Sequence, residues 1–163
     1  MQRLGAHQMN ILSVMSNIAT TYDMLGRHEE ALRTWQDVYS SWLNLCGEEN
    51  ENTLMAASNY ANLLIRLRRF EEGHSLLRKT IRVARRVRGD NDYQVLRMRP
   101  VYAVALYQND GATLNDIREA VATLEDTQRT ARRVLGSAHP LFGLIERDLQ
   151  KARAALRETP GSA

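Results

Sequence analysis

The sequence predicts an all-α protein, an αα-hairpin solenoid in which about three and a half repeats, seven helices in all, stack into a right-handed superhelical array. Three observations lead to this prediction. The segment "SNIATTYDMLGRHEEA" from Ser16 recurs as "SNYANLLIRLRRFEEG" from Ser58. Apolar residues recur at helical rather than strand spacing, and glycine-containing turns separate the helical segments. We therefore expect a single domain, residues 1–163.

The repeats share one register of 42 residues up to the third unit, where the spacing becomes 47 residues. Gly47 then corresponds to Gly89, and Gly89 to Gly136. This register predicts repeats at about 12–53, 54–95 and 96–142, the last with a five-residue insertion within "YQNDGATLNDIREAV". A C-terminal capping helix is expected at about 139–157. Because Leu4-Gly5 matches the end of an earlier linker, we expect the chain to be part of a longer repeat array.

The expected helices follow from stripes of apolar residues spaced three and four apart. They lie near residues 8–25, 28–46, 52–67, 70–88, 93–108, 116–135 and 139–157. The stripe of the second helix is formed by Ala31, Trp35, Val38, Trp42 and Leu45. The third helix has the stripe Leu54, Ala57, Ala61 and Leu64, and the seventh has Ile145, Leu149, Ala152 and Leu156. Each stripe is expected to be a buried helix face, and Trp35 and Trp42 to be core residues.

Turns are expected where glycine can end a helix with left-handed backbone angles. These turns are at Gly26, 47–52, 89–92, Asp110-Gly111 and 136–140. Asp116 and Glu119, three residues apart, predict the cap that opens the sixth helix. Pro100 falls inside the fifth helix, so we expect the third unit to be bent.

The repeats resemble tetratricopeptide repeats, in the 42-residue form typical of kinesin light chain. Ala19, Tyr22, Gly26 and Ala31 match the small, aromatic, glycine and alanine positions of that family, and "VLGSAHPLFGLIERDL" is similar to its linker. The second unit departs from the pattern, because Arg68 replaces the glycine and Gly73 the alanine. The resemblance implies a binding module for proteins or peptides without a catalytic site.

Composition narrows the class of protein further. The 163 residues are 44% hydrophobic and 25% charged, with no long apolar run and no apolar leader segment, so we expect a cytoplasmic protein without a membrane span. The lone Cys46 cannot form an internal disulfide and is expected to be a core thiol. Motifs of nucleotide-binding loops, zinc proteases and serine hydrolases are missing, so we expect no enzyme, no cofactor and no metal site.

The resemblance places the first helix of each hairpin on a concave face that binds a peptide segment. Asparagine is a poor interior helix former, so asparagines there call for a reason beyond propensity, and their amides suit the backbone of an extended peptide. Arginines beside them suit an acidic ligand. The candidate groove residues are Asn17, Thr20, Met24, Asn59, Asn62, Arg66, Arg97, Val104 and Tyr107. The alternative is that the asparagines only fill the groove between repeats and bond to neighbouring side chains.

A basic stripe gives a second candidate surface. Residues 65–99 hold eleven basic and four acidic side chains, and Arg78, Arg82, Arg85 and Arg86 share one face of the fourth helix. Such a stripe could bind nucleic acid or an anionic surface, although a solvated convex face explains it more simply. A third alternative is a spacer or oligomerisation segment of a larger regulatory protein. We expect a protein or peptide ligand rather than nucleic acid.

Overall fold

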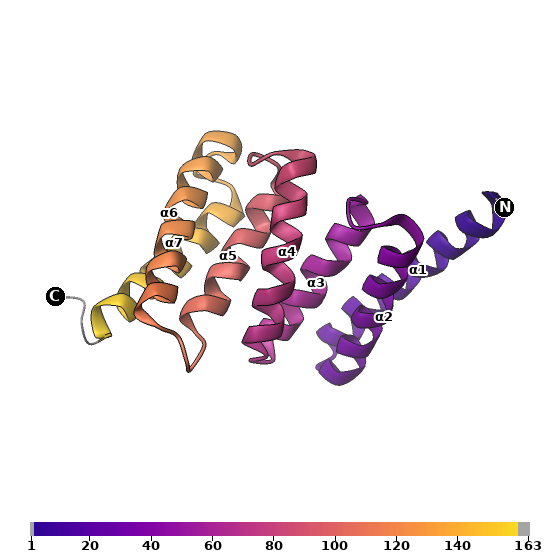
Figure 1. Ribbon diagram of the computed structural model, residues 1–163, viewed down its shortest axis with the longest axis horizontal. Coiled ribbons are helices and arrows are strands. Elements are labelled where there is room, and N and C mark those ends of the chain that lie inside the picture. Colours follow the sequence, from indigo (N-terminus) through magenta and orange to yellow (C-terminus); the bar gives the residue numbers. More distant parts are fainter. Residues whose placement is uncertain (1, 160–163) are drawn as a thin grey trace.

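The computed structural model describes residues 2–159, with side chains from residue 7 onward, and over this range the chain forms seven helices and no strand. Three hairpins stack side by side along the long axis of the molecule, and a single helix follows the last of them (Figure 1). The helices are α1 (Gln2–Met24), α2 (His28–Cys46), α3 (Glu51–Arg66), α4 (Phe70–Arg88), α5 (Tyr93–Tyr107), α6 (Leu114–Leu135) and α7 (Pro140–Glu158). The all-α solenoid of helical hairpins predicted from the repeats is confirmed.

The turns between successive hairpins have the same geometry at each recurrence. Gly47, Gly89 and Gly136 follow α2, α4 and α6 with φ of 80°, 83° and 83°, angles that favour glycine. Gly5, which the 42-residue register also aligns with Gly47, instead lies inside α1. The prediction that Leu4-Gly5 ends a linker is therefore wrong, because α1 continues as a helix through this position.

Side-chain caps open the helices that follow these turns. Asn50 and Asp92, one repeat apart, accept hydrogen bonds from the backbone N–H groups of Asn52 and Gln94 at 2.9 Å. His139 takes the same place before α7, where its Nδ1 accepts from the N–H of Leu141 at 3.1 Å. The recurring caps fix where α3, α5 and α7 begin, within one residue of the sequence prediction.

The cap of α6 differs from the prediction that Asp116 and Glu119 form it. Thr113 is the N-cap, because its Oγ1 accepts from the N–H of Asp116 at 3.2 Å while Asp116 Oδ2 accepts from the N–H of Thr113 at 2.8 Å. Glu119 instead accepts a hydrogen bond from the Tyr102 hydroxyl at 2.6 Å. The acidic partner of the cap was identified correctly, but its role and the start of the helix were not.

The five-residue insertion is divided between a turn and a helix. The turn 108–113 has three more residues than the turn 67–69, and α6 is three residues longer than α4 at 22 against 19. In compensation, α5 is one residue shorter than α3, at 15 against 16. Figure 1 shows this turn as an open, pointed loop between α5 and α6. Pro100 is buried inside α5, and the helix runs uninterrupted through it.

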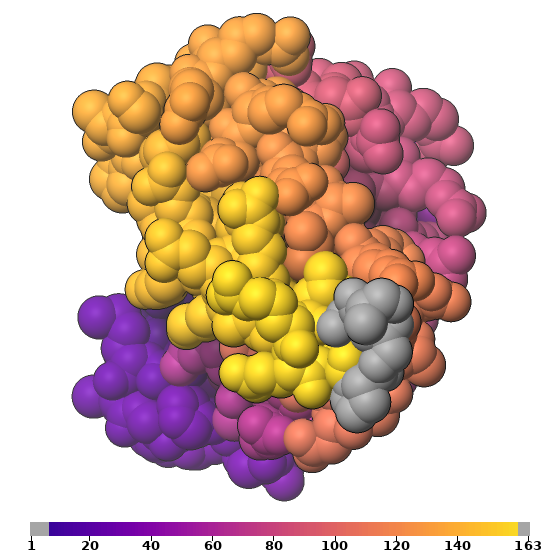
Figure 2. All heavy atoms as spheres, turned by 90° about the vertical axis from the view of Figure 1, so that its left-hand side faces the viewer, coloured from indigo at the N-terminus to yellow at the C-terminus, as the bar shows by residue number. Residues whose placement is uncertain are grey.

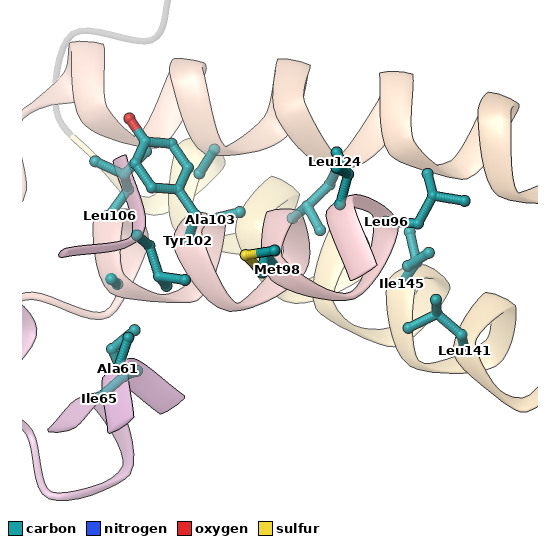
Figure 3. Close-up of a cluster of buried hydrophobic side chains, with 14 of the residues drawn as sticks. Ala61, Ile65, Leu96, Met98, Tyr102, Ala103, Leu106, Leu124, Leu141 and Ile145 are labelled. Carbon is teal, nitrogen blue, oxygen red and sulfur yellow. The ribbon is translucent and has the colours of Figure 1, made fainter. Parts of the chain in front are cut away.

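The predicted stripes form the core, apart from Leu156 of α7, which is half-buried, and Leu45 of α2. In α2, Ala31, Trp35, Val38 and Trp42 are buried, whereas Leu45 is 39% exposed at the uncovered N-terminal end of the stack, contrary to prediction. Cys46 is half-buried and packs against the same cluster. Figure 3 shows the larger cluster, in which Leu124 of α6 points towards α5, near Leu96 and Met98, with Ile145 of α7 beside them.

The last helix covers the C-terminal end of the stack, where α7 faces the viewer in Figure 2. Its inner face buries Phe142, Ile145 and Leu149. Leu54 and Ala61 of α3 are buried. The equivalent repeat positions in α7 are Gly143 and Gln150, and both are exposed. The last helix therefore presents a polar surface instead of a further packing face. Within the described range, none of the helices is long and apolar enough to cross a membrane.

Candidate peptide-binding groove

A groove of about 590 Å³ runs across the first helices of the second and third hairpins and onto α7. Its apolar lining comes from these three helices and from the first residue of α4, and includes Ile65, Phe70, Pro100, Val101, Val104, Leu141 and Leu144. Its polar lining consists of Ser58, Asn59, Asn62, Arg66, Arg68, Arg97, Gln108, Arg147 and Asp148. The groove therefore offers apolar contact area flanked by hydrogen-bonding and charged groups, the combination found in ligand-binding clefts.

The groove exists because the repeats place one helix face on the same side of the stack. Asn59 in α3 corresponds to Val101 in α5 at the 42-residue spacing, and to Asp148 in α7 at the further 47-residue spacing. Asn62 and Val104 are related in the same way. Residues three and four apart on a helix are neighbours, so each helix contributes a short strip of its surface. Adjacent strips together line the groove.

Five of the nine candidate residues lie in this groove, namely Asn59, Asn62, Arg66, Arg97 and Val104. Tyr107 is half-buried and packs against the core cluster instead. The three candidates in α1 lie outside the groove and are exposed: Asn17, Thr20 and Met24. The hydroxyl of Thr20 donates to the backbone oxygen of Ser16 at 3.0 Å.

Sequence reasoning missed the contribution of α7, which supplies Leu141, Leu144, Arg147 and Asp148. The signal was present, since the 47-residue spacing that aligns Gly89 with Gly136 also aligns Val101 with Asp148. Applying the register to the last helix would have found these residues. The seventh helix therefore has two roles, because it covers the end of the core and forms one wall of the groove.

The groove asparagines have unused hydrogen-bonding capacity. Asn62 is exposed and Asn59 half-buried, and within the described residues neither side-chain amide makes a hydrogen bond to another group of the protein. The part of the alternative in which they bond to neighbouring side chains is therefore not what the structure shows. Each amide keeps donors and an acceptor for groups outside the protein.

Two of the groove arginines are already neutralised by carboxylates. Arg66 forms an ion pair with Asp23 of α1, and Arg68 with Asp110 at 2.9 Å. Arg97 differs, because its described contacts are Gln94 at 3.4 Å and the ring of Tyr93, 5.9 Å from the guanidinium carbon to the ring centroid. Among these three arginines, Arg97 is thus the one best able to receive an acidic group.

Asp148 introduces a negative charge on the opposite wall of the groove. Its carboxylate has 15% side-chain exposure, and the Arg147 guanidinium lies 3.8 Å away, too far for a hydrogen bond. Burial raises the pKa of Asp148, since removing the carboxylate from water disfavours its charged form, while Arg147 and Lys151 act in the opposite direction. The groove therefore has a cation at Arg97 in α5 and a pair of opposite charges, Asp148 and Arg147, in α7.

The basic stripe of α4 is exposed, as expected for a solvated convex face. Two of its four arginines are paired with carboxylates, Arg85 with Asp90 and Arg86 with Glu49 at 2.7 Å. These carboxylates reduce the positive potential that a phosphate backbone would meet. Over the described range, no three His, Cys, Asp or Glu side chains come close enough together to hold a metal ion.

Comparison with known proteins agrees with the repeat pattern. Residues 10–86 match the tetratricopeptide repeat family model. The chain is similar, at 18% identity, to two crystal structures, one of them of a variant, that are named "Podosopora anserina putative kinesin light chain nearly identical TPR-like repeats". One of them has a TM-score of 0.75 over 99% of this chain and 77% of that one, and the other has 0.72 over 99% and 78%.

BtubC (BKLC) from P. vanneervenii is a further similar structure, at 19% identity and a TM-score of 0.68. The alignment covers 90% of this chain and 60% of BtubC, so the chain spans less than two thirds of that relative. A search of the curated proteins finds no match. The resemblance to tetratricopeptide repeats of the kinesin light chain-like type is confirmed at the level of the fold.

Proposed function

We propose that this tetratricopeptide-like solenoid is a non-catalytic adaptor that binds a peptide segment of a partner protein in the groove between α3, α5 and α7. Folds of this type serve protein–protein interaction in general and are typically non-catalytic. The site, rather than the fold, must identify the ligand.

The observation that carries the proposal is the combination of an apolar floor with unpaired polar groups in one hollow of about 590 Å³. Val104 and Leu144 offer apolar contact area to a side chain of the ligand, and Leu144 is 43% exposed. Asn59 and Asn62 have free amides that can pair with the N–H and C=O groups of an extended backbone.

The charges suggest the order of groups along the ligand. An acidic side chain is expected near Arg97, because Arg66 and Arg68 already have carboxylate partners. An apolar side chain is expected over Val104 and Leu144. On the α7 side, Arg147 and Asp148 lie 3.8 Å apart and offset each other's charge. The proposed ligand is thus an extended peptide with an apolar anchor and one acidic group.

The test begins with a peptide display selection against the intact protein, after which one selected peptide is labelled with fluorescein and titrated. Leu144→Glu should weaken binding at least tenfold, because it places a charge where the apolar anchor would be buried. The matched control is Val134→Glu, a residue of α6 with similar exposure, 42% against 43%, that does not line the groove. Equal losses in the two variants would reject the groove as the binding site.

Binding of nucleic acid or an anionic surface through α4 remains the alternative. It is less well supported, because Asp90 and Glu49 pair with Arg85 and Arg86. A steep loss of affinity for a labelled oligonucleotide with increasing salt, abolished by Arg82→Glu, would favour it over the groove. A chain that serves only as a spacer would select no peptide and bind no oligonucleotide.

A further inference from the structure

The N-terminal end of the stack leaves an apolar helix face uncovered. Ile11, Val14 and Ile18 of α1, and Leu25 directly after it, are 46%, 58%, 42% and 66% exposed. Their spacings of three, four and seven place them on one side of the helix. This side is distinct from the one that buries Leu12 and Ala19. We call the four residues the α1 outer face.

The repeats show that this face is built for packing. One repeat further on, the positions of Ile11, Val14 and Ile18 are occupied by Thr53, Ala56 and Tyr60 of α3. Thr53 and Ala56 are 2% and 1% exposed, and Tyr60 stacks on Tyr39 of α2 with ring centroids 6.4 Å apart. In α5 the same positions are Val95, Met98 and Tyr102, which are 0%, 0% and 9% exposed. In the second hairpin the equivalent face, that of α3, is covered by α2, and in the third hairpin that of α5 is covered by α4. No helix of the described chain covers the α1 outer face.

The described chain has no turn that could fold a preceding helix onto this face. Before α3 and α5 the chain turns at 47–50 and 89–92. The corresponding residues, 5–8, belong to α1, which is helical from Gln2. The helix therefore projects past the end of α2 instead of reversing (Figure 1). The cover must then come from outside the described chain.

We propose that a second copy of the chain covers the α1 outer face, with the two α1 helices packed antiparallel about a two-fold axis at Ile18. The spacing of the face is self-complementary in this arrangement. Ile18 meets Ile18 of the second copy, and Ile11 meets Leu25 of the second copy, because both lie seven residues from the axis. A symmetric pairing of identical faces closes on itself and produces a dimer.

The area and charge of α1 agree with such a pairing. The four side chains expose roughly 400 Å² together, about half of what each partner contributes to a stable interface, leaving the remainder to a polar rim. From residue 7 onward α1 has no basic group other than His7 and no acidic group other than Asp23, which already pairs with Arg66. Two copies of the helix therefore meet without strong repulsion.

Packing of the α1 outer face of one copy against α7 of another copy is disfavoured, because the exposed surface of α7 is polar. The outward positions of α7 hold Gly143 and Gln150, both exposed, in place of apolar residues. An apolar N-terminal face does not match this polar surface. The proposed dimer also leaves the groove between α3, α5 and α7 open, so its test is independent of peptide binding.

Single cysteines test the axis directly in the full chain with Cys46→Ser. Ile18→Cys would place two thiols across the two-fold axis, where helices 8–10 Å apart bring facing residues within disulfide range. Mild oxidation should cross-link Ile18→Cys to a covalent dimer at least tenfold faster than Met24→Cys. Met24 is the stringent control, since it lies on the same helix and is more exposed, at 83%. Equal rates would overturn the proposal.

Sedimentation of the unmodified chain over a micromolar concentration series provides the second measurement. We expect a reversible monomer–dimer equilibrium, with a dissociation constant raised at least tenfold by Val14→Glu and unchanged by Met24→Glu. Helicity by circular dichroism should be the same in both variants. A monomer at every concentration, or a dimer that Val14→Glu leaves intact, would overturn the pairing and assign the face to a different occupant.

Discussion

Gly73 tests the packing between the two helices of the second hairpin. It replaces the alanine found at the same repeat position as Ala31 and Ala120, and it is buried inside α4. A Cβ atom added at Gly73 would lie 2.6 Å from Cγ1 of Ile65 and 3.1 Å from the carbonyl oxygen of Ala61. The isoleucine fills the space that a methyl group would need, so the departure from the repeat pattern has a steric cause.

The cost of Gly73→Ala follows from two opposing effects. Alanine gains roughly 0.5–1 kcal/mol over glycine in a helix interior, while overpacking a core costs roughly 1–3 kcal/mol. Relief is difficult, because Cγ1 lies next to the Ile65 backbone and Ile65 is only 5% exposed. We expect a net loss of about 1 kcal/mol in the free energy of unfolding.

Urea unfolding followed by circular dichroism measures this change, with Gly143→Ala as the matched control. Gly143 also lies within a helix, but a Cβ there would meet nothing within 4 Å, so the substitution should stabilise the protein by about 0.5–1 kcal/mol. In an Ile65→Ala background, Gly73→Ala should become stabilising as well. If Gly73→Ala stabilises the otherwise unchanged protein as Gly143→Ala does, the steric reasoning is refuted.

Three further predictions concern the cap of α6, the groove carboxylate and the last helix. Thr113→Ala should lower the free energy of unfolding, measured in urea, by about 1 kcal/mol. Hydrogen bonds from Thr113 lower the pKa of Asp116 below its ordinary 3.8. The stability that the charged Asp116 contributes to the cap should therefore be present above pH 3.8 and disappear as the pH falls through the pKa of the folded state. Asp148→Asn should increase the melting temperature at neutral pH and reduce the gain in stability on acidification, since the raised pKa of Asp148 makes the folded protein favour the protonated form. Truncation after Gly136 should expose the core that α7 covers, lowering the melting temperature and promoting association in light scattering, and unchanged melting with a monodisperse product would contradict it.

The helices and most of their boundaries could be predicted because the helical spacing of apolar residues and the 42-residue repeat indicate the same segments. The helical spacing of Trp35, Val38 and Trp42 identifies a buried face, and the 42-residue register repeats the turn glycines at Gly47 and Gly89. The register failed at Gly5, where sequence similarity to a turn glycine did not prevent the helix from continuing. A glycine permits a turn, but it does not require one.

The groove could be predicted only in part, because its composition depends on which helices have neighbours. Asn17 has the same repeat position as Asn59, yet it does not line the hollow that Asn59 shares with α5 and α7. The ion pair between Arg66 and Asp23 joins residues 43 positions apart and left no signal in the local pattern. Conversely, Asp148 could have been found from the 47-residue spacing, had it been extended to the last helix.

The measurement that tests peptide binding in the groove most directly compares three variants by fluorescence anisotropy with one display-selected peptide. We expect Arg97→Glu to weaken binding roughly tenfold to a hundredfold, since a hydrogen bond to a charged group contributes about 1.5–3 kcal/mol, and Asn59→Ala to weaken it less. Arg82→Glu, which makes the same charge change on the convex face, should change affinity by less than about threefold at physiological salt. Loss of binding in Arg82→Glu together with unchanged affinity in Arg97→Glu and Asn59→Ala would contradict the groove and identify the basic stripe of α4 as the site.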